Sequence, residues 1–392
     1  MSRWLSESRK PCNRLDLWSN HGMPDPNAMS FEVAGYRALR KVAWEPSRLS
    51  VLVGANGSGK STLLSIPDFC ASLLSRGGTA TSSRHGGAYG IRSWGQEDPA
   101  EIRVRVGDLT WTLVLHEHGP GIKVEDTVAV AGDRVQAEGR VSRGGVGFAG
   151  AIDTEMGRLL ADGDERLVPY HDALRALQSY RHYQNPHFWT LRTQGSQAGH
   201  DTFLHPTGQN AFTVLRNWSG DRPERHRFGF VLEALRDAFP GIFEDLSFPP
   251  GGNTVAAEFF SAGSDRPMQA FLAPQGLLAA LLLATAVASL DEGGFVAIDE
   301  FENSLHPHAI HALIGAFRAR AEEQRLSIVL ATHSPVVLNA FRDDPEDVFV
   351  MDPAADTLPV RLTDLRNPDW LTHFSLGDLY EHLEFGAQGL DK

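Results

Sequence analysis

Apolar and polar residues follow two clear patterns at the two ends of the chain. Near the start, strand-like segments at 30–33 and 41–44 lead to an apolar run at 49–53, and apolar residues at helical spacing follow over 61–74. Near the end, the pattern predicts a helix at 277–290, a strand at 295–298, a helix at 307–324 and a strand at 327–331. Strand–helix–strand alternation is typical of a parallel sheet covered by helices. We therefore expect an α/β fold built on a mostly parallel sheet.

Between these ends the pattern changes twice. Alternating segments separated by glycine-containing turns predict antiparallel strands at 101–106, 110–116, 121–130 and 134–141. Farther on, the spacing predicts helices at 154–160, 169–180, 211–218 and 225–238, and then a hairpin formed by 244–248 and 254–260. Glycine-rich stretches at 75–90 and 139–150 have no apolar period and are expected to be flexible connections. The sheet should thus carry an antiparallel β subdomain and a helical lobe.

Composition and charge narrow the class of protein. The 392 residues include 36 Lys and Arg against 49 Asp and Glu, a net charge of −13, which argues against a surface covered with basic charge for nucleic acid but leaves a local basic groove open. Two cysteines, Cys12 and Cys70, exclude a disulfide scaffold and a Cys-based zinc site. The longest apolar run, 277–290, is too short to span a bilayer, and residues 1–28 lack the apolar run of a signal peptide. We expect a cytoplasmic protein with no membrane partner.

The first chemical motif lies between the predicted strand at 49–53 and the helix after it. Residues 54–62, here called the phosphate loop, fit G-x-x-x-x-G-K-[ST] in its required strand–loop–helix context. In such a loop, backbone N–H groups surround a phosphate, Lys60 reaches the β- and γ-phosphates, and the Ser61 hydroxyl ligates Mg²⁺. The expected nucleotide-binding residues are Gly54, Asn56, Gly57, Ser58, Gly59, Lys60, Ser61 and Thr62.

Two further motifs follow at strand ends. The strand at 295–298 ends in Asp299 and Glu300, which suit a water-mediated Mg²⁺ contact and the polarising of an attacking water, respectively. The strand at 327–331 ends close to His333, where a γ-phosphate could be sensed. Two acids or one histidine at a strand end are, taken singly, more often structural. The occurrence of all three motifs in order favours the functional interpretation.

In this order the motifs resemble those of ABC-type ATPase heads, and most closely the soluble heads of the RecF-like and OLD (overcoming lysogenization defect) group. The resemblance implies a P-loop NTPase fold, ATP and Mg²⁺ as cofactors, and Glu300, His333 and Lys60 as the catalytic residues, with His333 as the switch histidine. It also implies that residues 302–307 contact a partner subunit, with Asn303 near the partner's nucleotide. Asn210 and the segment 376–380 resemble secondary marks of the group.

The sequence departs from the pattern of ABC heads at the signature segment. Such heads carry Ser-x-Gly before the helix that precedes the carboxylate strand, and that serine contacts ATP on the opposite protomer. Alignment on Gly276 places Pro274 at the serine position, so the hydroxyl is missing. The free backbone N–H groups at the start of the helix that begins at Leu277 can still point at a phosphate. We expect Gly276 to lie near the partner's nucleotide, with hydrolysis slow or conditional.

Three other assignments rest on placement in the sequence. The glutamine that joins the Mg²⁺ site is Gln184, favoured over Gln96 because it follows the antiparallel strands. Tyr36 and Arg37 either contact adenine or ribose or form a surface turn. A group of middle-region arginines is either a nucleic-acid or partner-facing arm or a set of solvated helix faces: Arg175, Arg181, Arg192, Arg216, Arg222, Arg225 and Arg227.

These inferences divide the chain into four parts. They are an N-terminal tail (1–28), the N-terminal part of an ATPase head (29–150), a helical lobe with a hairpin (151–264), and the C-terminal part of the head (265–392). The residues after His333 are too few for a fused nuclease domain of the kind that full OLD proteins carry.

The leading functional hypothesis is an ABC-type ATPase that works as a homodimer on DNA or on a separately encoded effector, in DNA repair or phage defence. The alternative is a dimeric ATP-sensing scaffold that hydrolyses little and regulates a separately encoded nuclease or toxin. Pro274 favours the alternative, whereas Glu300 and His333 favour hydrolysis. A transport ATPase subunit is disfavoured because such subunits keep the serine of the signature.

Overall fold

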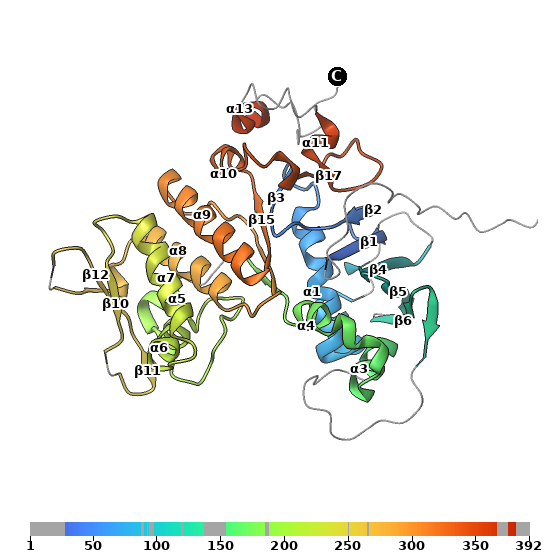
Figure 1. The fold of residues 1–392 in the computed structure, drawn as a ribbon, viewed down its shortest axis with the longest axis horizontal. Helices are drawn as coiled ribbons and strands as arrows, with labels where there is room; N and C mark the ends of the chain where they lie inside the picture. Colours follow the sequence, from blue (N-terminus) through green and yellow to red (C-terminus); the bar gives the residue numbers. More distant parts are fainter. Residues whose placement is uncertain are drawn as a thin grey trace, which may run out of the picture.

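The computed structural model describes residues 28–87, 90–91, 93, 98–118, 121–136, 154–184, 188–249, 251–264, 266–366 and 375–381. Within these ranges the chain forms a central parallel sheet with helices and a second, antiparallel sheet around it (Figure 1). The predicted α/β fold class is confirmed. The predicted N-terminal tail and the glycine-rich stretch at 139–150 lie outside the described residues.

The central sheet has six strands, of which one edge strand is antiparallel. In spatial order they are β17 (Val360–Arg361), β16 (Val348–Val350), β3 (Leu49–Val53), β15 (Ser327–Thr332), β14 (Phe295–Ile298) and β8 (Arg181–Tyr183). All neighbouring pairs except β16–β17 are parallel. The carboxyl ends of β8, β14, β15 and β3 therefore lie side by side along one edge.

This sheet separates two hydrophobic cores, which explains why its strands are apolar on both faces. Along β14, Val296 and Ile298 belong to the first core, whereas Phe295 and Ala297 belong to the second. Residues of β3 and β15 alternate between the two cores in the same way. The apolar runs at 49–53 and 295–298 thus reflect burial on both sides.

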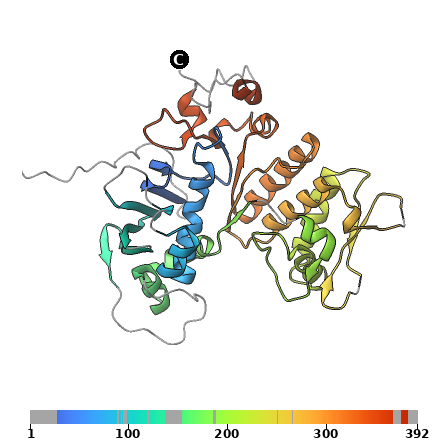
Figure 2. The same ribbon diagram turned by 180° about the vertical axis from the view of Figure 1, so that it is seen from behind.

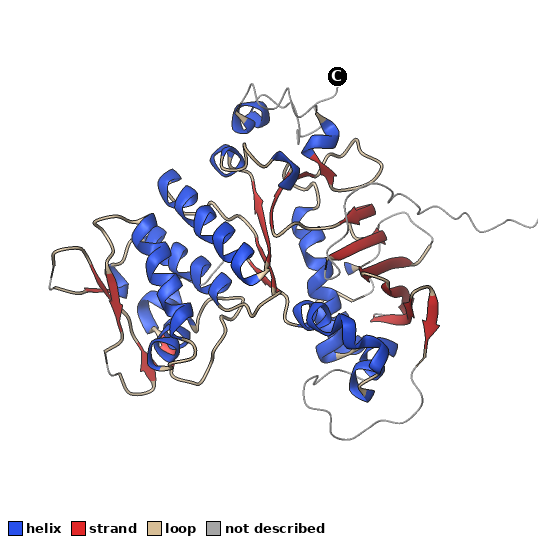
Figure 3. Cartoon of the chain, viewed as in Figure 1, coloured by secondary structure: helices blue, strands red, loops and turns tan. Residues whose placement is uncertain are grey.

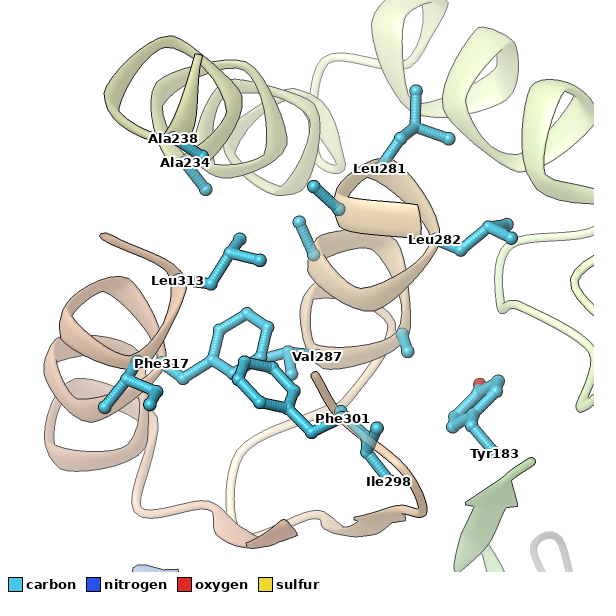
Figure 4. Packing of buried hydrophobic residues seen from close by; sticks show 14 of the residues in the cluster. Tyr183, Ala234, Ala238, Leu281, Leu282, Val287, Ile298, Phe301, Leu313 and Phe317 are labelled. Atoms are coloured by element: carbon cyan, nitrogen blue, oxygen red, sulfur yellow. The ribbon is translucent and has the colours of Figure 1, made fainter. Parts of the chain in front are cut away.

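Helices cover the face of the sheet that contacts the first core. The helices α7, α8 and α9 pack side by side there, and Figure 4 shows Ala234, Val287, Leu313, Phe317 and Phe301 meeting between them. Their bounds, with those of the neighbouring helices, are α5 (Phe188–Gln194), α6 (Ala211–Gly220), α7 (Arg225–Ala238), η3 (Ala270–Leu272), α8 (Gln275–Ala288) and α9 (Pro307–Gln324).

Small sheets complete this lobe. They pair β10 (Asp245–Ser247) with β12 (Glu258–Phe260), β12 with β13 (Met268–Gln269), and β11 (Thr254–Val255) with β9 (Ser196–Gln197). The predicted hairpin therefore exists between 245 and 260, but its second strand is split. Its first half, β11, pairs with β9 instead of β10.

The second core lies between the other face of the central sheet and the antiparallel sheet (Figure 3). The antiparallel order is β2 (Leu39–Trp44), β1 (Met29–Tyr36), β4 (Ala100–Val106), β5 (Leu109–His118), β6 (Gly121–Val130) and β7 (Asp133–Val135). Four helical segments join this core or border it: α1 (Lys60–Arg76), α3 (Glu155–Asp162), η2 (Glu165–Tyr170) and α4 (His171–Gln178).

Residues 155–183 pack differently from the rest of the segment 151–264. Met156, Leu159, Leu174 and Tyr180 contribute to the second core beside α1, and β8 adds a strand to the edge of the central sheet. The change of core comes between Tyr180, in the second core, and Tyr183, in the first. We therefore propose that the helical lobe begins near α5 and that it includes α8 and α9, which pack on α7.

The remaining C-terminal elements gather beyond β3 and β16, at the top of the view in Figure 2. They are α10 (Pro335–Asn339), η4 (Pro345–Asp347), α11 (Leu362–Leu365) and α13 (Leu376–Glu381). The helix α10 comes directly after β15 and His333, and α13 packs on α10. This packing brings a late segment of the chain to the edge of the central sheet.

The expectation of a flexible connection at 75–90 was wrong in part, because α2 (Gly78–Arg84) lies there. This short helix packs on α1 and β6, and the Thr81 hydroxyl donates to Ser72 Oγ at 3.1 Å. Thr81 and Ser82 are buried although they are polar. The sequence of α2 therefore shows no apolar period, although the helix is packed, because its buried side chains are polar.

Candidate functional site

The three predicted motifs meet at the carboxyl edge of the central sheet. The phosphate loop follows β3, His333 follows β15, Asp299 and Glu300 follow β14, and Gln184 follows β8. Because these four strands are neighbours and parallel, one edge collects residues that are more than 200 positions apart in the chain. Ligands of open α/β sheets bind at such an edge.

Glycines allow the phosphate loop to pass close to the rest of the molecule. Gly54 has φ 153°, and a Cβ there would lie 2.8 Å from Met351 Cβ. Gly59 has φ 99° and directly precedes α1, and a Cβ there would lie 2.9 Å from Leu39 Cδ2. No side chain caps the start of α1, so its first backbone N–H groups point into the loop. That arrangement binds phosphate.

Lys60 is buried at the centre of this edge. Its Nζ donates to the carbonyl oxygens of Gly54 at 2.7 Å and Ala55 at 3.2 Å, and it lies 2.8 Å from His333 Nε2. Burial lowers the pKa of Lys60 to about 8, against the opposing effect of the nearby carboxylates. Burial and the Lys60 charge also lower the pKa of His333, so a neutral imidazole accepts from the ammonium at Nε2.

Asp299 collects the groups expected at a cation site. The Ser61 hydroxyl donates to Asp299 Oδ2 at 2.6 Å, and the Gln184 amide donates to the same oxygen at 3.1 Å. Burial acts to raise the pKa of Asp299, but contacts with His182 and Ser61 and the Lys60 charge bring it below its ordinary value. The carboxylate is therefore ionised near neutral pH. Hydroxyl, carboxylate and amide oxygens are the ligands that Mg²⁺ prefers.

Glu300 is exposed beside this group. Its backbone lies in the left-handed region, with φ 53°, and Asn303 Nδ2 donates to its Oε2 at 2.5 Å. A left-handed conformation at a residue other than glycine is uncommon and marks functional sites more often than chance. The tight 299–304 loop thus directs one carboxylate into the site and the next toward solvent at its mouth.

Comparison with known families agrees with this geometry. Residues 49–110 and 164–339, more than half of the chain, match the AAA_21 family, described as "AAA domain, putative AbiEii toxin, Type IV TA system". The chain belongs to this AAA domain family. The matched residues include the phosphate loop, the carboxylate strand and His333. The protein therefore carries a P-loop ATPase domain of the AAA type.

Solved structures of Smc heads also match this AAA domain chain. An Smc head bound to the C-winged helix domain of ScpA is 13% identical and has a TM-score of 0.49 over 79% of this chain and 90% of that one. An Smc head with an extended coiled coil, bound to the C-terminal domain of ScpA derived from Pyrococcus furiosus, has a TM-score of 0.48 at 13% identity and the same coverage. The SMC head domain from Thermotoga maritima has a TM-score of 0.41 at 14% identity, again with this coverage. No curated protein matches the chain.

Two polar residues of this AAA domain protein were not assigned to its site by the sequence. Glu302 accepts from the Thr332 hydroxyl at 2.7 Å and from the His333 backbone N–H at 3.0 Å. Tyr380 of α13 places its hydroxyl 3.4 Å from His333 Nδ1. The sequence offered only the family resemblance of segments 302–307 and 376–380. It gave no sign that both segments hold the same histidine.

Gly276 and Asn303 were both predicted to face a partner. Within one chain, Gly276 at the start of α8 lies beside the 299–304 loop that carries Asn303. A Cβ on Gly276 would lie 2.7 Å from the Ser304 carbonyl oxygen, and the Gln275 amide donates to Ser304 Oγ at 2.9 Å. The start of α8 thus contacts the loop that carries Glu300. Their contact with a partner's nucleotide stays a prediction.

Other candidates do not join the site. Tyr36 is fully buried, so neither a nucleotide contact nor a surface position fits it. Arg37 is bonded to the carbonyls of Gly90 and His85. Asn210 fixes its own loop through His205 N and the Phe203 carbonyl. Gln96 lies outside the described residues.

The middle-region arginines are partly used within the fold. Arg227 donates to the carbonyls of Ala288 and Leu290 and pairs with Asp291, and Arg192 donates to the Ala273 carbonyl. Through these hydrogen bonds Arg227 links α7 to the C-terminal end of α8, and Arg192 links α5 to the residues just before α8.

Among the helices of the described ranges, none combines the length and the apolar character needed to span a membrane.

Proposed function

We propose that the protein binds ATP with Mg²⁺ at the carboxyl edge of the central sheet and hydrolyses it. The observation that carries this proposal is the convergence of Lys60, Ser61, Asp299 and His333 from three neighbouring strand ends. Ser61 Oγ lies 2.6 Å from Asp299 Oδ2, and Lys60 Nζ lies 2.8 Å from His333 Nε2. Motif matches alone do not bring these atoms together.

The residues at this edge suit distinct parts of the nucleotide. The backbone N–H groups of the phosphate loop and the Lys60 ammonium suit the phosphate oxygens. Ser61, Asp299 and Gln184 suit Mg²⁺, which supplies charge neutralisation for the phosphates when it is bound. The remaining loop residues, Asn56, Gly57, Ser58 and Thr62, complete the binding set.

Glu300 is the proposed general base. Its carboxylate is exposed to water, is adjacent in sequence to Asp299, and is oriented by Asn303. An oriented carboxylate can accept a proton from water that attacks a phosphate. His333 lies across the site at Lys60, where a neutral imidazole can sense the terminal phosphate.

We also propose that two chains close on ATP. The phosphate loop continues into α1 on the second-core side of the sheet, whereas Gly276 starts α8 on the first-core side. One rigid chain cannot bring both to the same phosphate, whereas a two-fold symmetric pair can. The work of this cycle is directed at DNA or at a separately encoded effector, in DNA repair or phage defence.

One observation favours a second candidate, an ATP-sensing scaffold with little hydrolysis. Pro274 stands at the N-cap of α8 and makes no side-chain cap. The hydroxyl that ABC heads use toward the partner's ATP is therefore missing. The matched family is described as a putative toxin of a toxin–antitoxin system, and a switch that regulates a toxin would need binding more than turnover.

Calorimetry of ATP–Mg²⁺ binding tests the proposal. Lys60→Ala removes the charge that faces the phosphates and should abolish measurable binding. Lys123→Ala is a matched control, because Lys123 is paired with Glu125 on the antiparallel sheet, away from the site. Equal ATP affinity in the wild type and Lys60→Ala would overturn the assignment, as would an absence of binding in the wild type.

A further inference from the structure

His182 is a histidine that the proposed ATPase site does not use, yet it faces that site. In the register of the central sheet His182 pairs with Ala297. Side chains of a strand alternate between faces, so Asp299, two residues beyond Ala297, extends from the same face as His182. Tyr183, the next residue of β8, belongs to the opposite, first core.

The imidazole points at the carboxylate without bonding to it. Its Nε2 lies 3.8 Å from Asp299 Oδ2, beyond hydrogen-bond length, and the two side chains are 14% and 4% exposed. Within the described structure, His182 Nε2 is buried and has no hydrogen-bond partner. A buried polar atom of this kind requires an explanation, because nearly all such atoms in proteins are satisfied.

The separation of these two atoms suits a shared metal ion. Ligands that each lie about 2.1 Å from one ion are about 3–4 Å apart. The 3.8 Å between His182 Nε2 and Asp299 Oδ2 falls in this range, whereas it is too long for a direct bond. The same Asp299 oxygen already accepts hydrogen bonds from Ser61 and Gln184, whose side-chain oxygens can add to the ligand set.

We propose that His182 is a nitrogen ligand of the cation held at Asp299. The site then prefers a first-row transition-metal dication over Mg²⁺, with direct contacts from both side chains. Imidazole nitrogen binds such metals better than it binds Mg²⁺, which favours oxygen ligands. This inference rests on the proposed nucleotide site, because phosphate oxygens must supply the remaining ligands. In the part of the chain that the structure describes, no group of three or more His, Cys, Asp or Glu side chains forms a metal cage by itself.

The test uses the full chain with Mn²⁺ and a non-hydrolysable ATP analogue. Pulsed electron paramagnetic resonance detects a nitrogen bound directly to Mn²⁺, and histidine labelled with ¹⁵N in its ring assigns that nitrogen. His182→Asn removes the ligand and keeps a polar side chain. His205→Asn is the matched control, because His205 Nε2 lies at a similar distance, 3.7 Å, from a different carboxylate oxygen, Asp201 Oδ2.

We expect an imidazole coupling in the wild type and in His205→Asn, and its loss in His182→Asn. Mn²⁺ affinity should fall on the order of tenfold in His182→Asn, while Mg²⁺ affinity stays within about twofold. A wild type that binds Mn²⁺ and the analogue without imidazole coupling would overturn the inference, and so would a coupling that survives His182→Asn.

Binding of a fluorescent ATP analogue with Mg²⁺, measured on the same samples, distinguishes this failure from failure of the proposed function. Analogue binding without imidazole coupling refutes only the His182 ligand. A lack of analogue binding with either metal refutes the nucleotide site, and the metal inference falls with it.

Discussion

His333 is the residue whose surroundings explain most about the site. Its Nε2 faces Lys60, its Nδ1 lies 3.4 Å from the Tyr380 hydroxyl, and its backbone N–H is held by Glu302. Three segments distant in sequence therefore fix one imidazole. A histidine held this way presents one nitrogen to the Lys60 ammonium and cannot rotate freely.

Tyr380→Phe removes the hydroxyl near His333 and leaves the ring in place. A neutral hydrogen bond contributes about 0.5–1.5 kcal/mol, so ATP turnover should fall by about 2- to 10-fold with unchanged nucleotide affinity. Steady-state turnover of Tyr380→Phe, His333→Ala and the double variant checks this. If Tyr380 acts through His333, the double variant should match His333→Ala. Full additivity of the two losses would contradict that role.

At the residue scale, the sequence predicted the site residues that belong to known motifs and missed the residues that reach the site only through tertiary packing. Lys60, Ser61 and Asp299 follow strands in fixed patterns, so their meeting could be expected. Gln184 was favoured by its placement, and it does contact Asp299. The roles of Glu302 and Tyr380 arise from loop and helix packing that no local pattern encodes, and the same applies to the complete burial of Tyr36.

At the scale of elements, the start of α8 and the 299–304 loop behave as one unit. Gly276 fits because it has no Cβ: a Cβ would lie 2.7 Å from the Ser304 carbonyl oxygen. Ser304 itself has φ 67°. A change at the start of α8 should therefore reach Glu300 through a rigid loop.

Gly276→Ala should destabilise the protein by about 1–3 kcal/mol, because backbone atoms must move to admit the methyl group. ATP turnover should fall as well, since Glu300 shifts with the loop. Gly315→Ala is the matched control within α9, where a Cβ meets nothing within 4 Å. That change should stabilise the protein by about 0.5–1 kcal/mol. Thermal unfolding of both variants decides, and equal effects would contradict the contact.

The helix α2 shows why the glycine-rich stretch was misread. Its buried face consists of Thr81 and Ser82, and the Thr81 hydroxyl donates to Ser72 of α1, so packing does not need an apolar period. The turn after it begins at His85, which is buried with its ring centroid 5.2 Å from that of Phe69. Composition indicated flexibility, whereas neighbouring elements impose the helix.

His85 predicts a pH dependence of stability. Burial lowers the pKa of His85 to about 4, although Asp68 opposes the shift, and Arg37 and Arg84 add to it. Between pH 6.5 and 4 the unfolded chain therefore binds a proton that the folded chain does not, so stability is lost as pH falls through this window. Chemical denaturation at pH 7 and pH 5 should show a smaller loss in His85→Gln than in the wild type. Identical losses would refute the assignment.

At the scale of the whole molecule, α1, which follows the phosphate loop, and the start of α8 lie on opposite faces of the central sheet. In the proposed function these are the two halves of one shared site. This arrangement predicts that Glu300→Gln, which retains ATP, forms a dimer with ATP–Mg²⁺. The missing signature hydroxyl should weaken closure by one charge-assisted hydrogen bond, about 1.5–3 kcal/mol, so the dimer should depend on ATP. Light scattering with and without ATP–Mg²⁺ measures the mass. A monomer in both conditions would contradict the shared site.

The architecture could be predicted from the sequence where burial on both faces of the sheet left long apolar runs. The strand at 295–298 and the helix at 307–324 were predicted at their observed bounds. Which core the helices at 155–178 join could not be predicted, because they have the same helical spacing as the helices beyond them and differ only in the core that they contact. The periodicity of apolar residues indicates that a helix is amphipathic, but it does not indicate which core the apolar face contacts.

The rate of ATP hydrolysis by Glu300→Gln tests the central claim most directly. The substitution keeps the size and hydrogen-bonding capacity of the side chain and removes its basicity. We predict that the variant binds ATP–Mg²⁺ as the wild type does and that its rate of hydrolysis is lower by about 10²-fold or more, the scale of general-base catalysis. Wild-type turnover in Glu300→Gln would contradict the account, because the chemistry would then belong to another residue.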